Sequence, residues 1–180
     1  MKPGGARRHG KFLRIAGKAP NCVAMNQSLR FRRAQAKEAD LLTALAGEAK
    51  RHWGYPAEWM KEWRNELTVT PDYVTTQPVY VGEMKAEIVG FFGLKLLDSG
   101  QHLEHLWLRP AFIGLGLGRL LFAEAVEKAR DLGVTELRIK SDPNAEAFYL
   151  KMGAVRIGSE VYQMLDNIRR EVPYLAFYIR

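Results

Sequence analysis

Residues 103–119 read LEHLWLRPAFIGLGLGR, and this stretch decides the fold. Its first six residues have the composition of a strand, and the proline that follows ends strand pairing. Three glycines then stand at every second position, at Gly114, Gly116 and Gly118, and apolar residues recur at helical spacing over 117–132. Because a helix N-terminus carries unpaired N–H groups and a partial positive charge, this glycine turn predicts a site for a phosphate group.

Two common nucleotide-binding motifs also place a glycine-rich turn between a strand and a helix. The dinucleotide fingerprint G-x-G-x-x-G requires a glycine where this chain has Arg119. The phosphate loop of nucleotide hydrolases requires Gly-Lys followed by Ser or Thr, and this stretch lacks that sequence. Both motifs are therefore excluded.

A second motif follows at residues 144–153, which read NAEAFYLKMG and predict a short helix. In this order, the two motifs resemble motifs A and B of the GCN5-related N-acetyltransferase (GNAT) family, R/Q-x-x-G-x-G/A at 113–118 and N-x-x-A-x-x-F-Y-x-x-x-G-F in the second stretch. The alanine of motif B is displaced by one place. In addition, Ile113 replaces the usual Arg or Gln, and Ala154 replaces the final aromatic residue.

The resemblance covers residues 29–180 and implies a single N-acetyltransferase domain. The implied fold class is α/β, with a central mixed and mostly antiparallel sheet that splays between its fourth and fifth strands and carries helices on both faces. The implied activity is transfer of an acetyl group from acetyl-CoA to a primary amine, by direct attack in a ternary complex and without a metal. A second hypothesis, an acyl-CoA-binding sensor without turnover, rests on the two departures from the motifs.

The resemblance also implies where acetyl-CoA binds. The thioester arm is expected beside the free backbone edge of the strand before the proline and against Asn144, and the pyrophosphate is expected on the N–H groups of the glycine turn. The expected cofactor-binding residues are Leu106, Trp107, Leu108, Ile113, Gly114, Leu115, Gly116, Leu117, Gly118, Arg119 and Asn144. As a residue at a helix start, Asn144 has an alternative role as a cap.

Acetyl transfer requires a neutral amine, and an alkyl ammonium has a pKa of about 10.4, so a base must remove a proton. Strict alternation along the strand places His102 and Glu104 on one face and Leu103 and His105 on the other. By resemblance, Glu104 is the first candidate for the base, His102 the second and Glu83 on a neighbouring strand the third. A glutamate near a strand end is equally consistent with a solvated or salt-bridged surface residue.

Two further roles follow from the resemblance. Tyr149 corresponds to the tyrosine that protonates the departing thiolate, although a buried tyrosine also fills a core. The reference pKa values of phenol and thiol differ by about 1.5 units, so full proton transfer costs roughly 2 kcal/mol and a hydrogen bond suffices. A backbone N–H near Leu106 is expected to stabilise the negative charge that develops on the carbonyl oxygen.

Hydrophobic periodicity predicts the remaining elements, including a turn at 98–100 that leads into the decisive strand. The expected strands are 29–33, 79–83, 88–97, 135–140, 155–158 and 175–180, and the expected helices are 35–51, 57–67, 117–132 and a short one ending at Lys151. A cluster rich in aromatic residues lies around the second helix and fills a core or walls the acceptor pocket: His52, Trp53, Tyr55, Trp59 and Trp63. Of these, His52 is expected at the surface.

Composition limits the remaining possibilities. The chain has 180 residues, of which 47% are hydrophobic, and no apolar run approaches the length of a membrane span, so we expect one domain and no membrane partner. The single cysteine, Cys22, excludes an internal disulfide and a Cys-rich zinc site and favours a reducing, cytoplasmic location. A free sheet edge makes a homodimer possible.

The net charge of +7 is concentrated at the N-terminus. Residues 1–24 hold six Lys or Arg and no acidic residue, which leaves 27 − 6 = 21 basic against 20 acidic residues in the rest of the chain. We interpret residues 1–28 as a basic, disordered leader or as an extension from a misplaced start codon. Because the remaining body is nearly neutral, a nucleic-acid partner is disfavoured.

Overall fold

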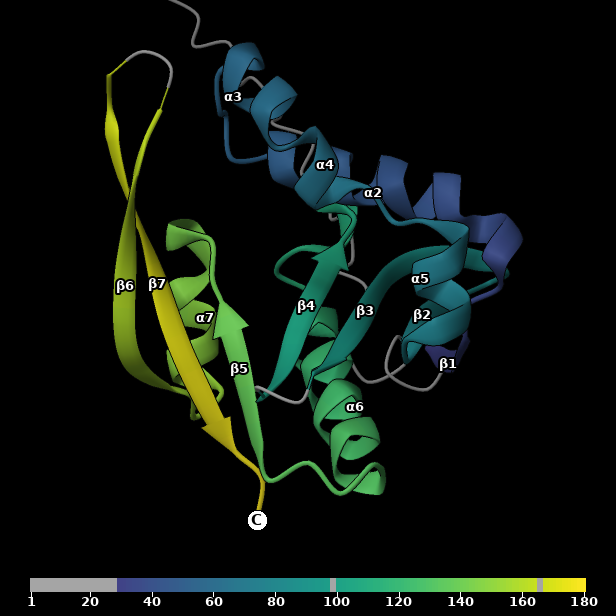
Figure 1. Ribbon diagram of the computed structural model, residues 1–180. Coiled ribbons are helices and arrows are strands. Elements are labelled where there is room, and N and C mark those ends of the chain that lie inside the picture. The colour runs from purple at the N-terminus through teal and green to yellow at the C-terminus, as the bar shows by residue number, and fades with distance from the viewer. Residues whose placement is uncertain (1–28, 98–99, 165–166) are drawn as a thin grey trace, which may run out of the picture.

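The computed structural model describes residues 29–97, 100–164 and 167–180. A seven-stranded sheet runs through this part of the chain in the order β1-β2-β3-β4-β5-β7-β6 (Figure 1). The first four strands form an antiparallel meander: β1 Arg30–Arg33, β2 Val79–Met84, β3 Glu87–Leu97 and β4 Gly100–Leu108. The expected hairpin of β2 and β3 is confirmed, whereas the turn expected at 98–100 falls largely outside the described residues.

The sheet splays between β4 and β5 (Glu136–Lys140), as predicted. These two strands run parallel and pair only at Gln101–Leu137 and His102–Arg138. Beyond this point they diverge, so the edge of β4 that faces β5 is left without a partner strand (Figure 1). The crossover between them is helix α6, Leu117–Asp131, preceded by the 3-10 turn η2, Pro110–Phe112.

The C-terminal part is a long antiparallel hairpin of β6 (Val155–Gln163) and β7 (Arg169–Tyr178), with β7 against β5. The strands expected at 155–158 and 175–180 are therefore too short, and residues 169–174 belong to β7 rather than to a connection. The sequence pattern was misleading because β6 is exposed over nearly its whole length and Pro173 lies inside β7. Neither strand shows the alternation that marks a half-buried strand.

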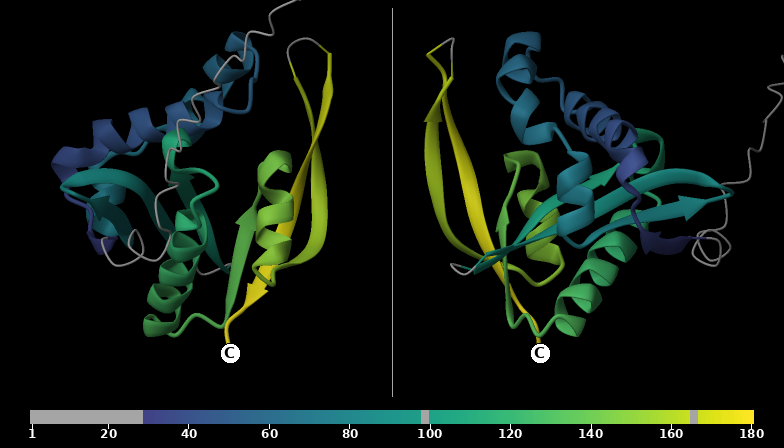
Figure 2. Two further views of the ribbon diagram at one scale, coloured as in Figure 1. Left: turned by 180° about the vertical axis from the view of Figure 1, so that it is seen from behind. Right: turned by 45° about the vertical axis from the view of Figure 1, so that its right-hand side comes forward.

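Helices cover both faces of the sheet (Figure 2). One face carries the 3-10 turn η1 Ala36–Glu38, α2 Ala39–Arg51, α3 Ala57–Glu62, α4 Arg64–Leu67 and α5 Pro71–Thr76. The other face carries α6, the 3-10 turn η3 Pro143–Ala145 and α7 Glu146–Lys151. The helix expected at 57–67 is divided at Trp63, and α5 was not expected at all.

Each face has its own apolar cluster, which fixes the helices that cover it. Leu42, Trp63 and Phe91 are buried in the cluster beneath α2, and Leu121 and Phe122 of α6 are buried in the cluster on the opposite face. The α/β fold class with helices on both faces is therefore confirmed.

Candidate active site

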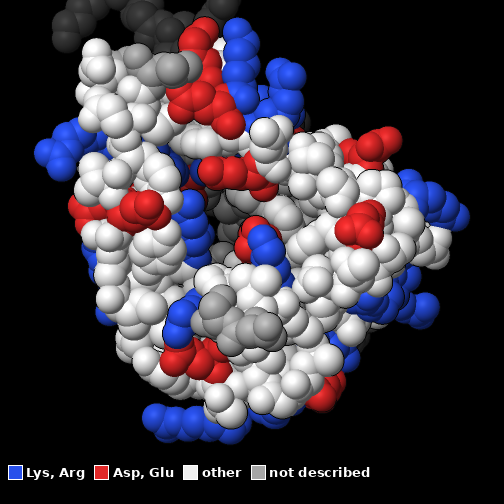
Figure 3. Space-filling view, in the orientation of Figure 1, with Lys and Arg blue, Asp and Glu red and all other residues white. Residues whose placement is uncertain are grey.

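A cavity of about 750 Å³ lies where β4 and β5 diverge. Figure 3 shows this hollow between the two halves of the molecule, with Asp and Glu side chains along its upper rim. It is bounded by β4, the glycine turn, α6, the segment after β5, α7 and the end of α2. The lining residues are Ala49, Trp53, Glu104, Leu106, Trp107, Leu108, Ile113, Gly114, Leu115, Gly116, Gly118, Arg119, Leu121, Lys140, Asp142, Asn144, Ala145, Phe148, Tyr149, Lys151 and Met152.

The glycine turn forms one end of this cavity. Gly114 and Gly116 have φ values of +83° and +81°, a left-handed conformation that favours glycine, and a Cβ at either position would meet no atom within 4 Å. Gly116 is the N-cap of α6, no side chain caps its N–H groups, and its first turn contains no acidic residue. Unpaired N–H groups and the positive end of the helix dipole therefore remain available, and these features fit a phosphate group.

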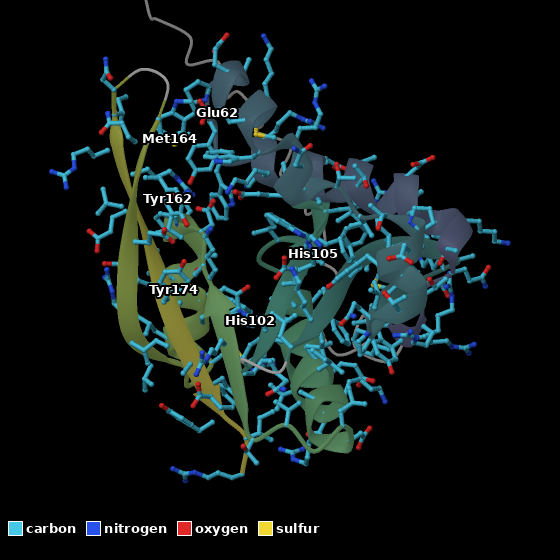
Figure 4. All side chains as sticks on the ribbon, viewed as in Figure 1. Glu62, His102, His105, Tyr162, Met164 and Tyr174 are labelled. Carbon is cyan, nitrogen blue, oxygen red and sulfur yellow. The ribbon has the colours of Figure 1, made fainter. Side chains whose placement is uncertain are left out.

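Most of the residues expected at the site lie at the cavity. Twelve of the fourteen line it: Glu104, Leu106, Trp107, Leu108, Ile113, Gly114, Leu115, Gly116, Gly118, Arg119, Asn144 and Tyr149. Leu117 does not, because its side chain is fully buried in the core, so only its backbone lies at the turn. His102 is not among the lining residues either, and it pairs with β3 and β5 where the two halves of the sheet are still joined (Figure 4).

Because of a β-bulge at Glu104, the side chains of β4 are distributed between the two faces of the sheet differently from the prediction. His105 is paired with Gly93 and Leu103 with Leu94, so Glu104 is an extra residue without a partner on β3. As a consequence, Leu103 packs against the α6 side, whereas His105 packs on the opposite side of the sheet. The expectation that these two residues share a face was wrong, because a bulge interrupts the period of two.

The candidates for the base have different surroundings. Glu104 lies at the cavity, is partly exposed, and has the Lys95 ammonium at 3.6 Å. Glu83 lies on β2, which β3 separates from β4, so the expectation that it lies on the strand next to β4 was wrong. Its carboxylate pairs with Arg32 at 2.5 Å, and it is not among the residues that line the cavity. The role of Glu104 stays a prediction, and the bulge supports it by releasing this residue from the pleat of the strand.

His105, next to Glu104, is buried on the other side of the sheet (Figure 4). The Trp107 indole N–H donates to His105 Nδ1 at 3.1 Å, and the Tyr73 and Phe91 rings lie against the imidazole. Burial lowers the pKa of His105 to about 4. The imidazole is therefore neutral at physiological pH and has a packing role.

Tyr149 lies on α7, is buried, and has its ring against Phe122 and Phe148. Burial raises its pKa well above the ordinary value of 10.0, and the charge of Asp142 adds to this effect. Tyr149 therefore remains a neutral phenol at physiological pH, a hydrogen-bond donor at the cavity wall. Ala154, one of the two departures from the motifs, is buried in the core and does not line the cavity.

The opposite end of the cavity is held by a buried ionic cluster that the sequence did not reveal. Asp142, which follows β5, accepts hydrogen bonds from Lys50 of α2, from Arg170 of β7 at 3.0 Å and from the Tyr55 hydroxyl at 2.8 Å. The side chains of Lys50, Asp142 and Arg170 are only 10%, 8% and 11% exposed. Both cations also lie over the Trp63 ring, with Lys50 Nζ at 4.3 Å from its centroid and Arg170 Cζ at 4.7 Å.

This cluster sets the charge states of its members and the position of Asn144. Burial lowers the pKa of Lys50. Burial alone would raise the pKa of Asp142, but Lys50 and the donated hydrogen bonds outweigh it and hold that pKa below the ordinary 3.8. Asp142 also caps η3 by accepting from the Asn144 N–H, and the Asn144 amide donates to the Tyr55 hydroxyl at 2.8 Å. The cap of this short helix is therefore Asp142, and the alternative role of Asn144 as a cap was wrong.

The aromatic cluster is divided between the core and the cavity wall. Trp59 and Trp63 are buried in the core, whereas Trp53 lines the cavity and Tyr55 joins the ionic cluster. The sequence placed these residues at packing intervals but could not divide them between the two roles. His52, expected at the surface, is exposed.

A family described as "Acetyltransferase (GNAT) domain" matches residues 41–165. The chain belongs to the GNAT acetyltransferase family. The recognition made from the two motifs is thereby confirmed, as is the prediction of an N-acetyltransferase-type enzyme. A curated relative, an uncharacterized N-acetyltransferase from Lactobacillus delbrueckii, is 28% identical over 99 residues, which are 49% of this chain and 57% of that protein.

Solved GNAT structures share the fold. A GCN5-related N-acetyltransferase from Rhodopseudomonas palustris superposes with a TM-score of 0.70 at 18% identity, over 84% of this chain and 96% of that one. The PaiA N-acetyltransferase from Thermoplasma acidophilum, solved with coenzyme A, gives a TM-score of 0.65 at 18% identity, over 84% and 99% of the two chains. A coenzyme A complex therefore exists for this fold, and the expected cofactor is the one that the family binds.

The described part of the chain contains neither a membrane-spanning helix nor a metal-binding cluster. No helix within it is long and apolar enough to cross a membrane. No group of three or more His, Cys, Asp or Glu side chains in the same ranges is arranged to hold a metal ion.

Proposed function

We propose that this protein is an acetyl-CoA-dependent N-acetyltransferase that acetylates a primary amine directly, in a ternary complex. One observation carries the proposal: the uncapped N-terminus of α6, the unpaired edge of β4, Glu104 and Tyr149 all border one cavity. Family membership supports the class of reaction, and the cavity residues supply the proposed roles.

The residues of the glycine turn would hold the coenzyme. N–H groups around Gly116 and Gly118 are suited to the pyrophosphate, and the Arg119 and Lys151 side chains add positive charge at the cavity wall. Ile113 offers no side-chain donor at the position where the family pattern has Arg or Gln. The free edge of β4 at 106–108 offers hydrogen bonds to an extended arm. The bound coenzyme supplies an activated acetyl thioester.

Glu104 is proposed to remove the proton that the acceptor amine must lose. The carboxylate lies in the cavity because the bulge releases it from the alternation of β4. The Lys95 ammonium lies 3.6 Å from the Glu104 carboxylate and fixes its place at the cavity wall. As the amine nitrogen forms its bond to the acetyl carbon, the carbon–sulfur bond breaks and the excess proton passes to Glu104, directly or through water.

Two donors are proposed for the negative charge that the reaction creates. The backbone N–H near Leu106 would donate to the acetyl oxygen, since this edge of β4 has no partner strand. The Tyr149 hydroxyl would donate to the leaving sulfur. Burial raises the pKa of Tyr149, so full transfer of its proton to a thiolate is less favourable than for an exposed tyrosine. Its role is therefore hydrogen-bond donation, with the thiolate finally protonated by solvent.

The experiment is amine-dependent release of the coenzyme A thiol by the full-length chain, measured over a panel of primary amines. Glu104→Gln is expected to lower kcat about 100-fold with little change in the KM for acetyl-CoA. Tyr149→Phe is expected to lower kcat roughly tenfold, the value of one hydrogen bond to a charged group. The matched controls are Glu136→Gln, a paired and partly exposed glutamate outside the cavity, and Tyr178→Phe on the surface.

The outcomes separate the two hypotheses made from the sequence. Turnover that falls in both cavity variants and not in the controls supports the enzyme and the assigned roles. Coenzyme binding without thiol release across the whole panel would favour the sensor instead. Thiol release that is unchanged in Glu104→Gln would refute this glutamate as the base while leaving the acetyltransferase intact.

A further inference from the structure

A second, smaller cavity of about 190 Å³ lies between α3–α4 and the β6–β7 hairpin. Figure 4 shows Glu62 on the helical side opposite Tyr162 and Met164 on the hairpin. The lining residues are Glu62, Trp63, Glu66, Lys140, Tyr162, Gln163, Met164, Arg170 and Val172. Lys140 lines both this cavity and the larger one, so the two adjoin at the end of β5.

One acidic and one basic side chain of this smaller cavity are not paired with each other. Glu66 of α4 and Lys140 of β5 are both exposed, and within the described residues neither forms an ion pair shorter than 4.0 Å with the other or with any other side chain. The Lys140 ammonium instead lies over the Tyr162 ring, 4.6 Å from its centroid. The carboxylate and the ammonium are thus available to a ligand.

The charges are also segregated by wall. The acidic side chains come from the helical wall, Glu62 and Glu66, and the basic ones come from the sheet wall, Lys140 and Arg170. Because Arg170 is already paired with Asp142, Lys140 supplies the positive charge that this wall offers to a ligand. A purely cationic ligand would gain from the first wall and be repelled by the second, and a purely anionic ligand would meet the reverse. A group that carries an ammonium and a carboxylate side by side is attracted by both walls.

We propose that the smaller cavity binds the zwitterionic α-amino-acid end of the acceptor, and that the acceptor is an α,ω-diamino acid acetylated on its side-chain amine. The inference rests on the proposed acetyltransferase function and names the substrate class for the same site. The α-ammonium faces Glu66 and the carboxylate faces Lys140, while the side chain extends past Lys140 into the larger cavity. The ω-nitrogen forms the amide bond, the thioester carbon–sulfur bond breaks, and the amino-acid end is unchanged.

Four amines that present the same reacting group isolate each charge. Lysine carries both charges of the zwitterion, 1,5-diaminopentane lacks the carboxylate, 6-aminohexanoate lacks the α-ammonium, and pentylamine lacks both. We expect kcat/KM to be highest for the diamino acid and roughly tenfold lower for each charge removed, because each contact is a charge-assisted hydrogen bond. The same comparison is repeated with compounds that are one methylene shorter: ornithine, 1,4-diaminobutane, 5-aminopentanoate and butylamine. The proposal is judged on the chain length that gives the higher kcat/KM.

Two charge-removing variants test the walls separately. Glu66→Gln should remove the preference for the α-ammonium, so that lysine and 6-aminohexanoate become equal substrates. Lys140→Met should remove the preference for the carboxylate, so that lysine and 1,5-diaminopentane become equal. Glu58→Gln and Lys61→Met change the same charges on α3 outside both cavities and should leave every ratio unchanged.

Failure of this inference is distinguishable from failure of the acetyltransferase function. Equal kcat/KM for pentylamine and lysine, or a preference for the diamine, would overturn the zwitterion site while thiol release still proves turnover. If no amine is acetylated, binding tests the zwitterion site instead: the same four compounds are titrated by calorimetry into protein saturated with coenzyme A. Binding of lysine at least tenfold tighter than of the other three supports the site, and equal or undetectable binding overturns it.

Discussion

The two ends of the main cavity are built in different ways. The end proposed for the coenzyme, called the coenzyme end below, uses backbone from one continuous stretch, the free edge of β4 and the uncapped start of α6, with glycines where φ is positive. The end proposed for the acceptor, called the acceptor end below, uses side chains from elements far apart in the sequence. They are joined at Asp142: Lys50 from α2, Tyr55 from the loop after it and Arg170 from β7.

This difference separates a site that a short local motif encodes from one that distant segments build. A backbone site requires only the right local conformation, so a short motif encodes it. A side-chain site requires that distant segments meet, and its buried charges must find partners. We therefore propose that the first end binds the coenzyme and that the second end supports the acceptor side of the cavity and part of the stability.

The largest expected effect comes from removing the carboxylate at the centre of the acceptor end. Asp142→Asn leaves Lys50 and Arg170 buried without an anion, and we expect a loss of about 3–5 kcal/mol in the free energy of unfolding. Glu171→Gln, which breaks an exposed pair with Arg156, is the matched control and should cause no measurable change. Urea denaturation of both variants checks this, and equal stabilities would show that the cluster contributes nothing.

The same carboxylate predicts the pH dependence of stability. Because the pKa of Asp142 is lower in the folded than in the unfolded state, its contribution is fully present above the ordinary value of 3.8 and is lost as pH falls through the folded pKa. The stability of the wild type should therefore fall more steeply below about pH 4 than that of Asp142→Asn. Parallel curves in urea titrations at several pH values would contradict the assigned ionic state.

An intermediate effect tests the coenzyme end. Gly116 and Gly133 bracket α6 with φ values of +81° and +75°, and a Cβ at either would meet no atom within 4 Å. Alanine at either position should cost a similar 1–2 kcal/mol or so of stability through backbone strain. Only Gly116→Ala should also weaken acetyl-CoA binding, by roughly tenfold, since Gly133 lies outside the cavity. Equal affinities in the two variants would remove the glycine turn from the coenzyme site.

The smallest expected effect comes from restoring the motif. Ile113 is 44% exposed at the cavity wall, so an arginine side chain can replace it without entering the core. Ile113→Arg should tighten acetyl-CoA binding about threefold, the contribution of one partly solvated charge to phosphate binding. A loss of affinity would show that the isoleucine has a specific contact with the coenzyme.

The sequence predicted the fold and most of the residues that line the cavity because both depend on local patterns. The glycines before α6 and the strand before them specified the splayed sheet and placed the cavity, and the second motif located α7. The basic leader of residues 1–28 lies outside the described residues, which begin at residue 29, and the single-domain boundary stays a prediction.

The rest could not be predicted, for physical reasons that differ by residue. The bulge at Glu104 adds one residue to a ladder, and a period of two cannot reveal the insertion. The cluster around Asp142 depends on Lys50 and Arg170, which lie on separate elements and each resemble an ordinary surface charge in the sequence. β6 buries none of its apolar side chains, and the first three residues of β7 are charged, so burial in a core did not mark the full length of either strand in the sequence.

The most direct test of the central claim is a calorimetric titration of the full-length protein with acetyl-CoA, run in parallel with Gly116→Ala and Gly133→Ala. We expect binding with a dissociation constant in the micromolar range, weakened only in Gly116→Ala. No binding at millimolar acetyl-CoA would contradict the assignment of the α6 N-terminus as the coenzyme site and, with it, the proposed acetyltransferase function.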